Sequence, residues 1–460
     1  MELIQGLANI QNSPPKVARL AVRRGVLKVG RLRTPNRWFR VSSGALCGLV
    51  GVVSGLLLNS GGALADNPND VDESQLDASS VTTGDPHHPN VGARTVDFWS
   101  GSSTVNGQTF NYDIVGADPA TGSTSTVVVD VVLVDVRVGG VTFHASDVLD
   151  PVLASPIFQA ADYSATSMAS SSTMRVGAGG DLSSGNVGVQ LTDAVMRSQF
   201  NQTGTDYHLN LVPSSVHKPV LIDVPASAGV TMTSRNGHVT VAWVDQTWFL
   251  TRVEALTASL HWLEPHRLAM FLTNDVLLTT GGAARHCCVF GDHGVTNVTA
   301  EGNGSNGRQA LQTYVWSSWL TPGFFNPALP WSVKDISGLS HEVVEWANDP
   351  FLTNITNRWT APGYACNAMF ETGDPSVGIG FSVGANTFID PADPSISPAH
   401  PLGFGDGTYH VQDVVFLPWF IGLSPNTMSE PMQGTTDQGR YTFLGNLNRF
   451  GRLHTPTPGC

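Results

Sequence analysis

The sequence is poor in charged side chains, and several catalytic motifs are missing from it. Asp, Glu, Lys and Arg make up only 13% of its 460 residues. It contains no Gly-x-x-x-x-Gly-Lys-Ser/Thr loop for nucleotide phosphates. It has no Cys-x-x-Cys pair, which disfavours a cysteine-based metal site. These absences argue against P-loop nucleotide enzymes and against metal sites built on paired cysteines.

Glycine and proline are abundant instead. The 48 glycines and 28 prolines favour a globular protein rich in strands and loops over a helical bundle. The length favours one large domain or two smaller ones.

The N-terminal region has the features of an export signal. Residues 16–40 carry nine Lys and Arg side chains and no acid, an apolar run follows at 45–58, and Ala-Leu-Ala at 63–65 has the small residues of a cleavage site. We therefore expect residues 1–65 to be a signal peptide with a basic leader, cleaved after Ala65, and the mature protein to be secreted, extracellular or periplasmic. A membrane anchor is the alternative, although an apolar run of about 14 residues is short for a span.

Cleavage would leave a strongly acidic chain. Nine of the 24 basic side chains but only one of the 37 acidic side chains lie before the cleavage site, so 15 basic side chains would remain against 36 acidic ones. Such a surface repels nucleic acid and anionic lipid. We therefore expect no nucleic-acid partner and, after cleavage, no membrane partner. The oligomeric state stays open.

Four cysteines remain in the expected mature chain, an even number that predicts two disulfides in an oxidising compartment. Adjacent Cys287 and Cys288 would form a strained ring if they paired with each other. Each is therefore expected to pair with one of Cys366 and Cys460, and the sequence leaves open which of these two pairings forms.

The most informative segment reads SHEVVEWANDP at residues 340–350. Residues four apart on a helix lie on the same face, so His341 and Glu345 would project together, with Glu342 beside them. An imidazole and a carboxylate can hold a metal ion, and a second carboxylate can act as the base in hydrolysis. The zincin motif has histidine at the position of Glu345, so the match is partial.

A solvated polar helix face is the alternative interpretation of this segment. Against it, Glu345 and Asp349 lie toward the C-terminal end of the helix, where the helix dipole disfavours acids. A compensating cation would remove that penalty. The Asp-Pro pair at 349–350 could also be only a helix stop.

Further ligands would have to come from other segments. Glu371 and Asp374 follow the helix by about 25 residues, and either carboxylate could bind the ion. A polar turn at 372–375 is the alternative. His293 ends a predicted strand and turn at 287–293, and it is a candidate oxyanion donor or extra ligand, or else a structural histidine.

These patterns predict an α+β fold in three mature segments. Residues 66–94 are polar and acidic and are expected to form a disordered lead-in. Residues 95–240 are expected to form a β-rich N-terminal domain, because the β-branched run 126–138 predicts a strand that ends at a Gly-Gly turn. A turn-rich link is expected at 149–158, and a short helix with a Thr or Asp cap at 192–200. Asp245 is expected to cap a helix from residue 246 to about 262, and the helix that carries 340–350 is expected to begin near Asp335 or Ser337 and to stop at Pro350. The order helix, strand, turn, strand, helix within 241–460 resembles zinc peptidases and predicts a zincin-like domain, with a twisted sheet against the active-site helix.

The segment 340–350 resembles the SHExxExxTDP segment of a family of secreted bacterial metallopeptidases. It is also similar to the HELAExxTNP segment of the plant Exordium (phosphate-induced protein 1) family. An ExxD beside a cysteine follows in both groups, which residues 366–374 match, and residues 288–293 resemble their CGxH segment. The resemblance covers roughly residues 245–460 and, more weakly, 150–245.

Two residues depart from the usual motif without touching a candidate ligand: Trp346 and Asn348 stand where Ala and Thr are usual. The bacterial members are regarded as metallopeptidases, and the plant members are cell-wall growth proteins without an established activity.

The resemblance implies roles for the candidate side chains. His341, Glu345 and one of Glu371 and Asp374 would hold Zn²⁺ or another divalent ion, and Glu342 would be the general base. We therefore expect a secreted metal-dependent hydrolase of peptide or protein substrates. The alternative is a non-catalytic extracellular or cell-envelope interaction protein that keeps the fold and a structural ion such as Ca²⁺. Glycan hydrolysis by paired carboxylates without a metal is a third class.

Overall fold

The computed structural model describes residues 92–163, 187–214, 216–234, 237, 239–279, 287–299, 309–325, 333–360, 366–376, 380–384, 408–424 and 441–445. They belong to one compact unit within 49–460. The expected signal peptide and nearly all of the expected lead-in lie outside the described residues. Within the described part of the chain, none of the helices has the length and apolar composition that a membrane span requires.

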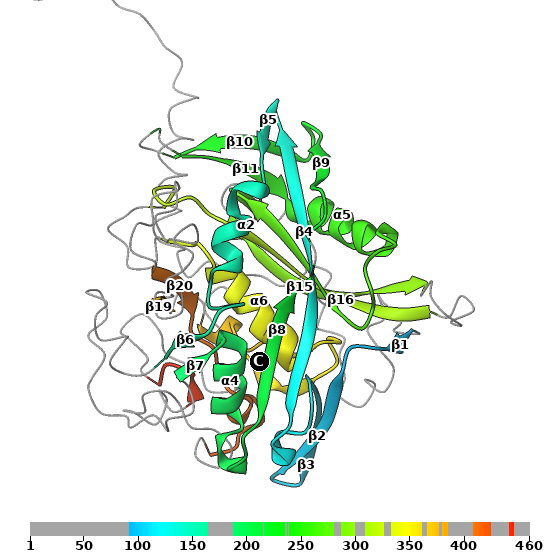
Figure 1. Cartoon of the computed structure of the whole chain (residues 1–460), viewed down its shortest axis with the longest axis vertical. Helices are drawn as coiled ribbons and strands as arrows, with labels where there is room; N and C mark the ends of the chain where they lie inside the picture. Colours follow the sequence, from blue (N-terminus) through cyan, green and yellow to red (C-terminus); the bar gives the residue numbers. More distant parts are fainter. Residues whose placement is uncertain are drawn as a thin grey trace, which may run out of the picture. The chain divides into compact units, whose positions relative to one another are not determined.

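A mixed, mostly parallel sheet forms the centre of the fold (Figure 1). Its eight strands are β1 (Ala93–Arg94), β4 (Thr124–Val138), β5 (Val141–Phe143), β8 (His208–Pro213), β9 (Val220–Val224), β12 (Leu268–Asn274), β15 (Gly291–Thr299) and β16 (Gln309–Trp319). β4 runs parallel to β8, β9 and β12, and β16 runs parallel to β1 and β12. β15 and β5 are antiparallel to β16 and β4.

β4 crosses the sheet because its valines can be buried on both faces. Val129 and Val131 enter one hydrophobic core, and Val132 and Val134 enter another on the opposite face. The predicted strand 126–138 is confirmed. The turn after it is confirmed as well, because Gly139 and Gly140 both have positive φ (57° and 84°), as a tight two-residue hairpin requires.

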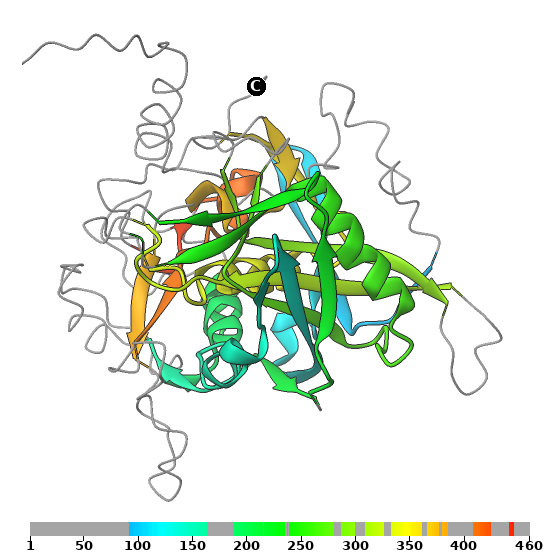
Figure 2. The ribbon, with the colours of Figure 1, turned by 90° about the horizontal axis from the view of Figure 1, so that it is seen from above.

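Helices cover both faces of this sheet (Figures 1 and 2). Those that share the first core are α2 (Ser146–Leu153), α4 (Leu191–Gln199) and α6 (Ser337–Asn348). α5 (Gln246–Ser259) contributes to the second core. α5 begins as expected, because its N-cap Asp245 accepts a hydrogen bond from Trp248 N (3.0 Å).

Smaller elements surround these layers. The pairs are β2 (Phe98–Val105) with β3 (Gln108–Val115), β6 (Ala161–Asp162) with β7 (Val187–Val189), β17 (Ile355–Trp359) with β18 (Asn367–Met369), and β19 (Gly380–Gly384) with β20 (Thr408–Gln412). A four-stranded sheet consists of β10 (Gly229–Thr233), β11 (Thr240–Asp245), β13 (Val276–Thr279) and β14 (Cys287–Val289). The short helices are η2 (Pro119–Thr121), η4 (Asn201–Thr203), η7 (Asp374–Ser376) and α7 (Leu417–Ile421).

The fold is thus a mixed α/β arrangement around one mostly parallel sheet. A sheet does lie against the predicted active-site helix, since α6 contacts β15 and β16. Strands from both predicted mature domains enter this sheet, because β4 from 95–240 pairs with β12 from 241–460. Ala93–Arg94, the last residues of the predicted lead-in 66–94, also join it as β1.

Candidate metal centre

α6 brings three of the candidate side chains together. It extends from Ser337 to Asn348, within the bounds expected from the sequence, and all of its residues are buried. The alternative of a solvated polar face is therefore wrong. His341 Nε2 lies 2.9 Å from Glu345 Oε2, one turn later, and 3.9 Å from Glu342 Oε1.

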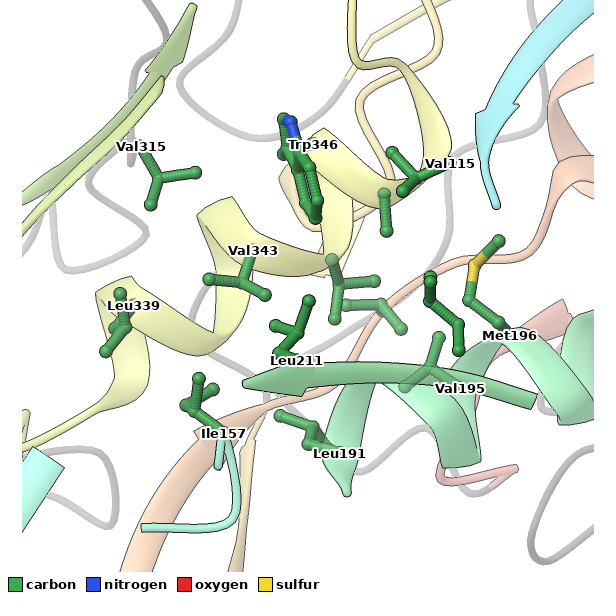
Figure 3. Packing of buried hydrophobic residues seen from close by; sticks show 14 of the residues in the cluster. Val115, Ile157, Leu191, Val195, Met196, Leu211, Val315, Leu339, Val343 and Trp346 are labelled. Carbon is green, nitrogen blue, oxygen red and sulfur yellow. The ribbon is translucent and has the colours of Figure 1, made fainter. Parts of the chain in front are cut away.

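The apolar side chains of α6 fix its rotation in the core. Leu339, Val343 and Trp346 pack among buried residues of β8, β16 and α4 (Figure 3). Trp346 Nε1 also donates a hydrogen bond to Thr313 Oγ1 (3.0 Å). Each fully buried aliphatic side chain contributes about 1.5–3 kcal/mol. This packing leaves the helix one orientation, in which His341 lies among the acids.

β15 contributes His293 to the same place. Gly291, His293 and Val295 share one face of the strand, and Val295 belongs to the core that contains α6. His293 Nδ1 lies 3.3 Å from Glu342 Oε2 and 3.5 Å from Glu345 Oε2. Gly291 allows the side chain of Glu342 to lie close to β15, because a Cβ at this position would lie 2.3 Å from Glu342 Oε1.

The segment after β18 contributes the two remaining candidates. Glu371 and Asp374 are both only 1% exposed, so they are not part of a solvated polar turn. Glu371 Oε2 lies 3.6 Å from His293 Nε2, and Asp374 Oδ1 lies 3.6 Å from His341 Nε2. The two carboxylates therefore approach different histidines.

Gly373, between these acids, joins the segment to the helix. Its N–H donates a hydrogen bond to Glu345 Oε1 (2.7 Å), and a Cβ on it would lie 2.4 Å from His341 Nδ1. Only a residue without a side chain permits so close an approach. The glycine thus brings Asp374 within reach of the helix.

Gln412, at the end of β20, is a site residue that the sequence reasoning missed. Its Nε2 lies 2.8 Å from His341 Nδ1 and donates to Gly373 O (2.7 Å). Its backbone N–H donates to Ser340 Oγ (3.0 Å), which anchors β20 to α6. The ring of His341 is thereby fixed through Nδ1, and Nε2 faces the acids. The sequence signal that could have indicated it is the amide side chain of Gln412 within the largely hydrophobic segment 410–420.

We call the six converging side chains the acid–histidine cluster. Its members are His293, His341, Glu342, Glu345, Glu371 and Asp374, all at most 1% exposed. When ionised, the four carboxylates carry two more charges than two protonated imidazoles can balance. Uncompensated buried charge is costly, and a divalent cation would offset it. Imidazole nitrogen and carboxylate oxygen are also ligands that Zn²⁺ and related ions take, so the residues fit a metal ion.

Asp349, just after α6, has a different environment. Its Oδ1 accepts a hydrogen bond from Thr353 N (2.9 Å) and its Oδ2 accepts one from Asn354 N (3.0 Å). Burial raises the pKa of Asp349 to about 7. The residue therefore ends the helix by capping the following turn, in line with the interpretation of 349–350 as a helix stop.

Cysteines precede two of the segments that form the cluster. Cys288 and Cys366 are both disulfide-bonded, and they lie close before His293 and Glu371 in the chain. Cross-links at these points limit the freedom of both segments in the unfolded chain. Cys460 lies outside the described residues, and the pairing stays open.

Comparisons with known proteins add no identification. No family model matches the sequence, and searches of curated proteins and of solved structures found no match. The function of the protein is therefore inferred from the geometry of the cluster.

Proposed function

We propose that the protein is a secreted metal-dependent peptide hydrolase whose helix and sheet are arranged as in zincins. One observation carries the proposal: the six side chains derived from the sequence, on three separate segments, meet in one buried cluster. The resemblance of residues 340–350 to secreted bacterial metallopeptidases and to the plant Exordium family supports it.

The proposed ion is Zn²⁺, with His341, Glu345 and one of Glu371 and Asp374 as ligands. An ion held there would supply Lewis-acid chemistry, polarising a peptide carbonyl and lowering the pKa of water. Two carboxylate ligands favour harder ions more than two imidazoles do, so Mn²⁺ is expected to compete with Zn²⁺.

Glu342 is the proposed general base. It follows His341 directly in α6, and its Oε2 lies near His293 Nδ1. In that position its carboxylate can take a proton from water and deliver it to the leaving amine of the cleaved peptide. The neighbouring His293 would donate a hydrogen bond to the oxygen that becomes negatively charged. Burial of the cluster strengthens each of these electrostatic contacts.

The experiment is a peptidase assay on purified protein with casein, with and without a chelator. We expect chelator-sensitive cleavage, and we expect Glu342→Gln to lower kcat by about 10²- to 10⁴-fold, the usual contribution of a general base. Asp413→Asn is the matched control, because Asp413 is also fully buried but bonds to backbone N–H groups.

The rival is a non-catalytic extracellular interaction protein with a structural ion. Bound metal without any cleavage of casein, or equal cleavage by the wild type and Glu342→Gln, would favour that rival. Cleavage that a chelator leaves unchanged would contradict the metal-dependent mechanism.

A further inference from the structure

The acid–histidine cluster divides into two sets of ligands that share one residue. His341, Glu345 and Asp374 form the first set, and His293, Glu345 and Glu371 form the second. Within each set the ligand atoms lie within 4.8 Å of one another. Among the described residues, the ligand atoms of all five side chains do not lie within this distance of one another, so they form two sets and not one larger set.

This grouping has a direct consequence for coordination. Ligand atoms bonded at about 2.0–2.2 Å to one ion lie no more than about 4.4 Å from each other. A single ion would therefore bind one set and leave the histidine and the acid of the other set outside its coordination shell. Two ions would use both sets.

Glu345 is placed to serve both sets. Its Oε2 lies 2.9 Å from His341 Nε2 and 3.5 Å from His293 Nδ1. Its Oε1 accepts the N–H of Gly373 (2.7 Å), which fixes the orientation of the carboxylate. Among the described residues no group donates a hydrogen bond to Oε2 in acceptable geometry, although the residue is fully buried. The lone pairs of that oxygen are therefore available to cations between the two rings.

The charge of the cluster agrees with two ions. Its four ionised carboxylates and two neutral imidazoles together carry four negative charges. Two divalent cations would neutralise these four charges, so the charge of the cluster is compatible with double occupancy once both imidazoles act as neutral ligands.

We propose that the cluster binds two divalent cations, with Glu345 Oε2 bridging them. His341 and Asp374 complete the first site, and His293 and Glu371 complete the second. Two-metal hydrolases hold their ions about 3.5–4 Å apart, a spacing that one bridging oxygen permits. The inference rests on the proposed metal-dependent function and deepens it. It makes both Glu371 and Asp374 ligands, and it gives His293 a ligand role in place of an oxyanion role.

The test is titration of the metal-free, full-length protein with Mn²⁺, followed by calorimetry and by electron paramagnetic resonance. We expect two equivalents of bound Mn²⁺ and a spectrum with exchange coupling between neighbouring ions. Glu371→Gln and Asp374→Asn are each expected to bind one equivalent and to lose the coupling. Asp413→Asn is the control and should keep both equivalents. Circular dichroism checks the fold of each variant. The stoichiometry and the spectrum of the wild type test the proposal even if a variant fails to fold.

The outcomes separate this inference from the proposed function. One equivalent of uncoupled Mn²⁺ in the wild type would overturn the second site but leave a single-metal hydrolase standing. Two equivalents without coupling would overturn the bridge through Glu345. Absence of any binding by the folded protein would overturn both proposals.

Discussion

Two groups of buried acids near α6 differ in the partners that their oxygens meet. Glu342, Glu345, Glu371 and Asp374 face two histidines and one another. Asp349 and Asp413 are equally buried, but backbone N–H groups donate to their oxygens. Burial alone therefore does not identify a functional carboxylate. Asp349 and Asp413 stabilise the turns whose N–H groups they accept, whereas the acids gathered around imidazoles form a site that attracts a cation, even though Glu345 also accepts the N–H of Gly373.

The largest contrast is expected between Glu345→Gln and Asp349→Asn. Glu345→Gln removes a shared ligand, so the affinity for Zn²⁺ should fall by more than about 100-fold, the upper range for losing a supporting residue. Asp349→Asn places an amide N–H against a backbone N–H, so unfolding free energy should fall by about 1–3 kcal/mol while metal stoichiometry stays unchanged. Calorimetric titration and urea denaturation measure the two effects. Equal metal loss in both variants would remove the distinction between the two groups of acids.

A smaller loss of metal affinity is expected from Gly373→Ala. The new Cβ would lie 2.4 Å from His341 Nδ1, so the ring must shift from its position beside Asp374. We expect Zn²⁺ affinity to fall by about 10- to 100-fold, as for other residues that orient a ligand. Gly107→Ala is the control, since its positive φ (86°) makes alanine strained but no atom lies within 4 Å of the added Cβ. Zinc titration of Gly373→Ala that matches the wild type would contradict this role.

Asp413 should make the folded protein less stable as the pH rises. Burial raises its pKa from 3.8 to about 7, so between these values the folded state holds a proton that the unfolded state has lost. Stability from this group is thus full below about pH 4 and is lost as the pH approaches 7, at no more than about 1.4 kcal/mol per pH unit. Asp413→Asn should remove this component. Urea denaturation between pH 4 and 8 measures it, and identical pH slopes for both proteins would contradict the assignment.

The smallest effect concerns an acid that only caps a helix. Asp245 accepts a hydrogen bond from Trp248 N at the start of α5, and it is not a member of the cluster. Asp245→Ala should lower the unfolding free energy by about 1 kcal/mol and leave metal binding unchanged. Thermal denaturation and zinc titration check the two parts. A change in zinc affinity would mean that the cluster is coupled to α5.

Elements with a local signal could be predicted from the sequence. α6 has the expected bounds because a helical pattern ends just before Pro350. The run 126–138 became β4, since β-branched residues suit a pleated strand buried on both faces. Asp245 begins α5 because its carboxylate satisfies a free N–H of the first turn.

Other elements were missed because tertiary contacts decided them. α2 (Ser146–Leu153) lies where a turn-rich link was expected, and it has no side-chain cap and contains Pro151. The short helix near 192–200 was expected to begin with a Thr or Asp cap, but Asp193 lies inside α4. Its Oδ2 lies 2.7 Å from His208 Nδ1, in a strand that no local pattern connects to the helix.

The candidate site divides in the same way. Helical spacing predicted that His341 and Glu345 would share a face, since this depends on one segment alone. The contacts of Gln412 and Gly373 with His341 join segments far apart in the chain. Glutamine and glycine occur in many environments, so their residue types alone do not predict such contacts. Spacing also cannot distinguish a buried polar face from a solvated one, which is why the solvated alternative for α6 arose.

The central claim is that the acid–histidine cluster holds divalent metal, and anomalous X-ray diffraction from crystals of protein loaded with zinc tests it most directly. The account predicts strong anomalous density at the zinc edge beside Glu345 Oε2, between the rings of His293 and His341. Well-ordered side chains in that place with no anomalous density, or zinc bound only at the protein surface, would contradict it.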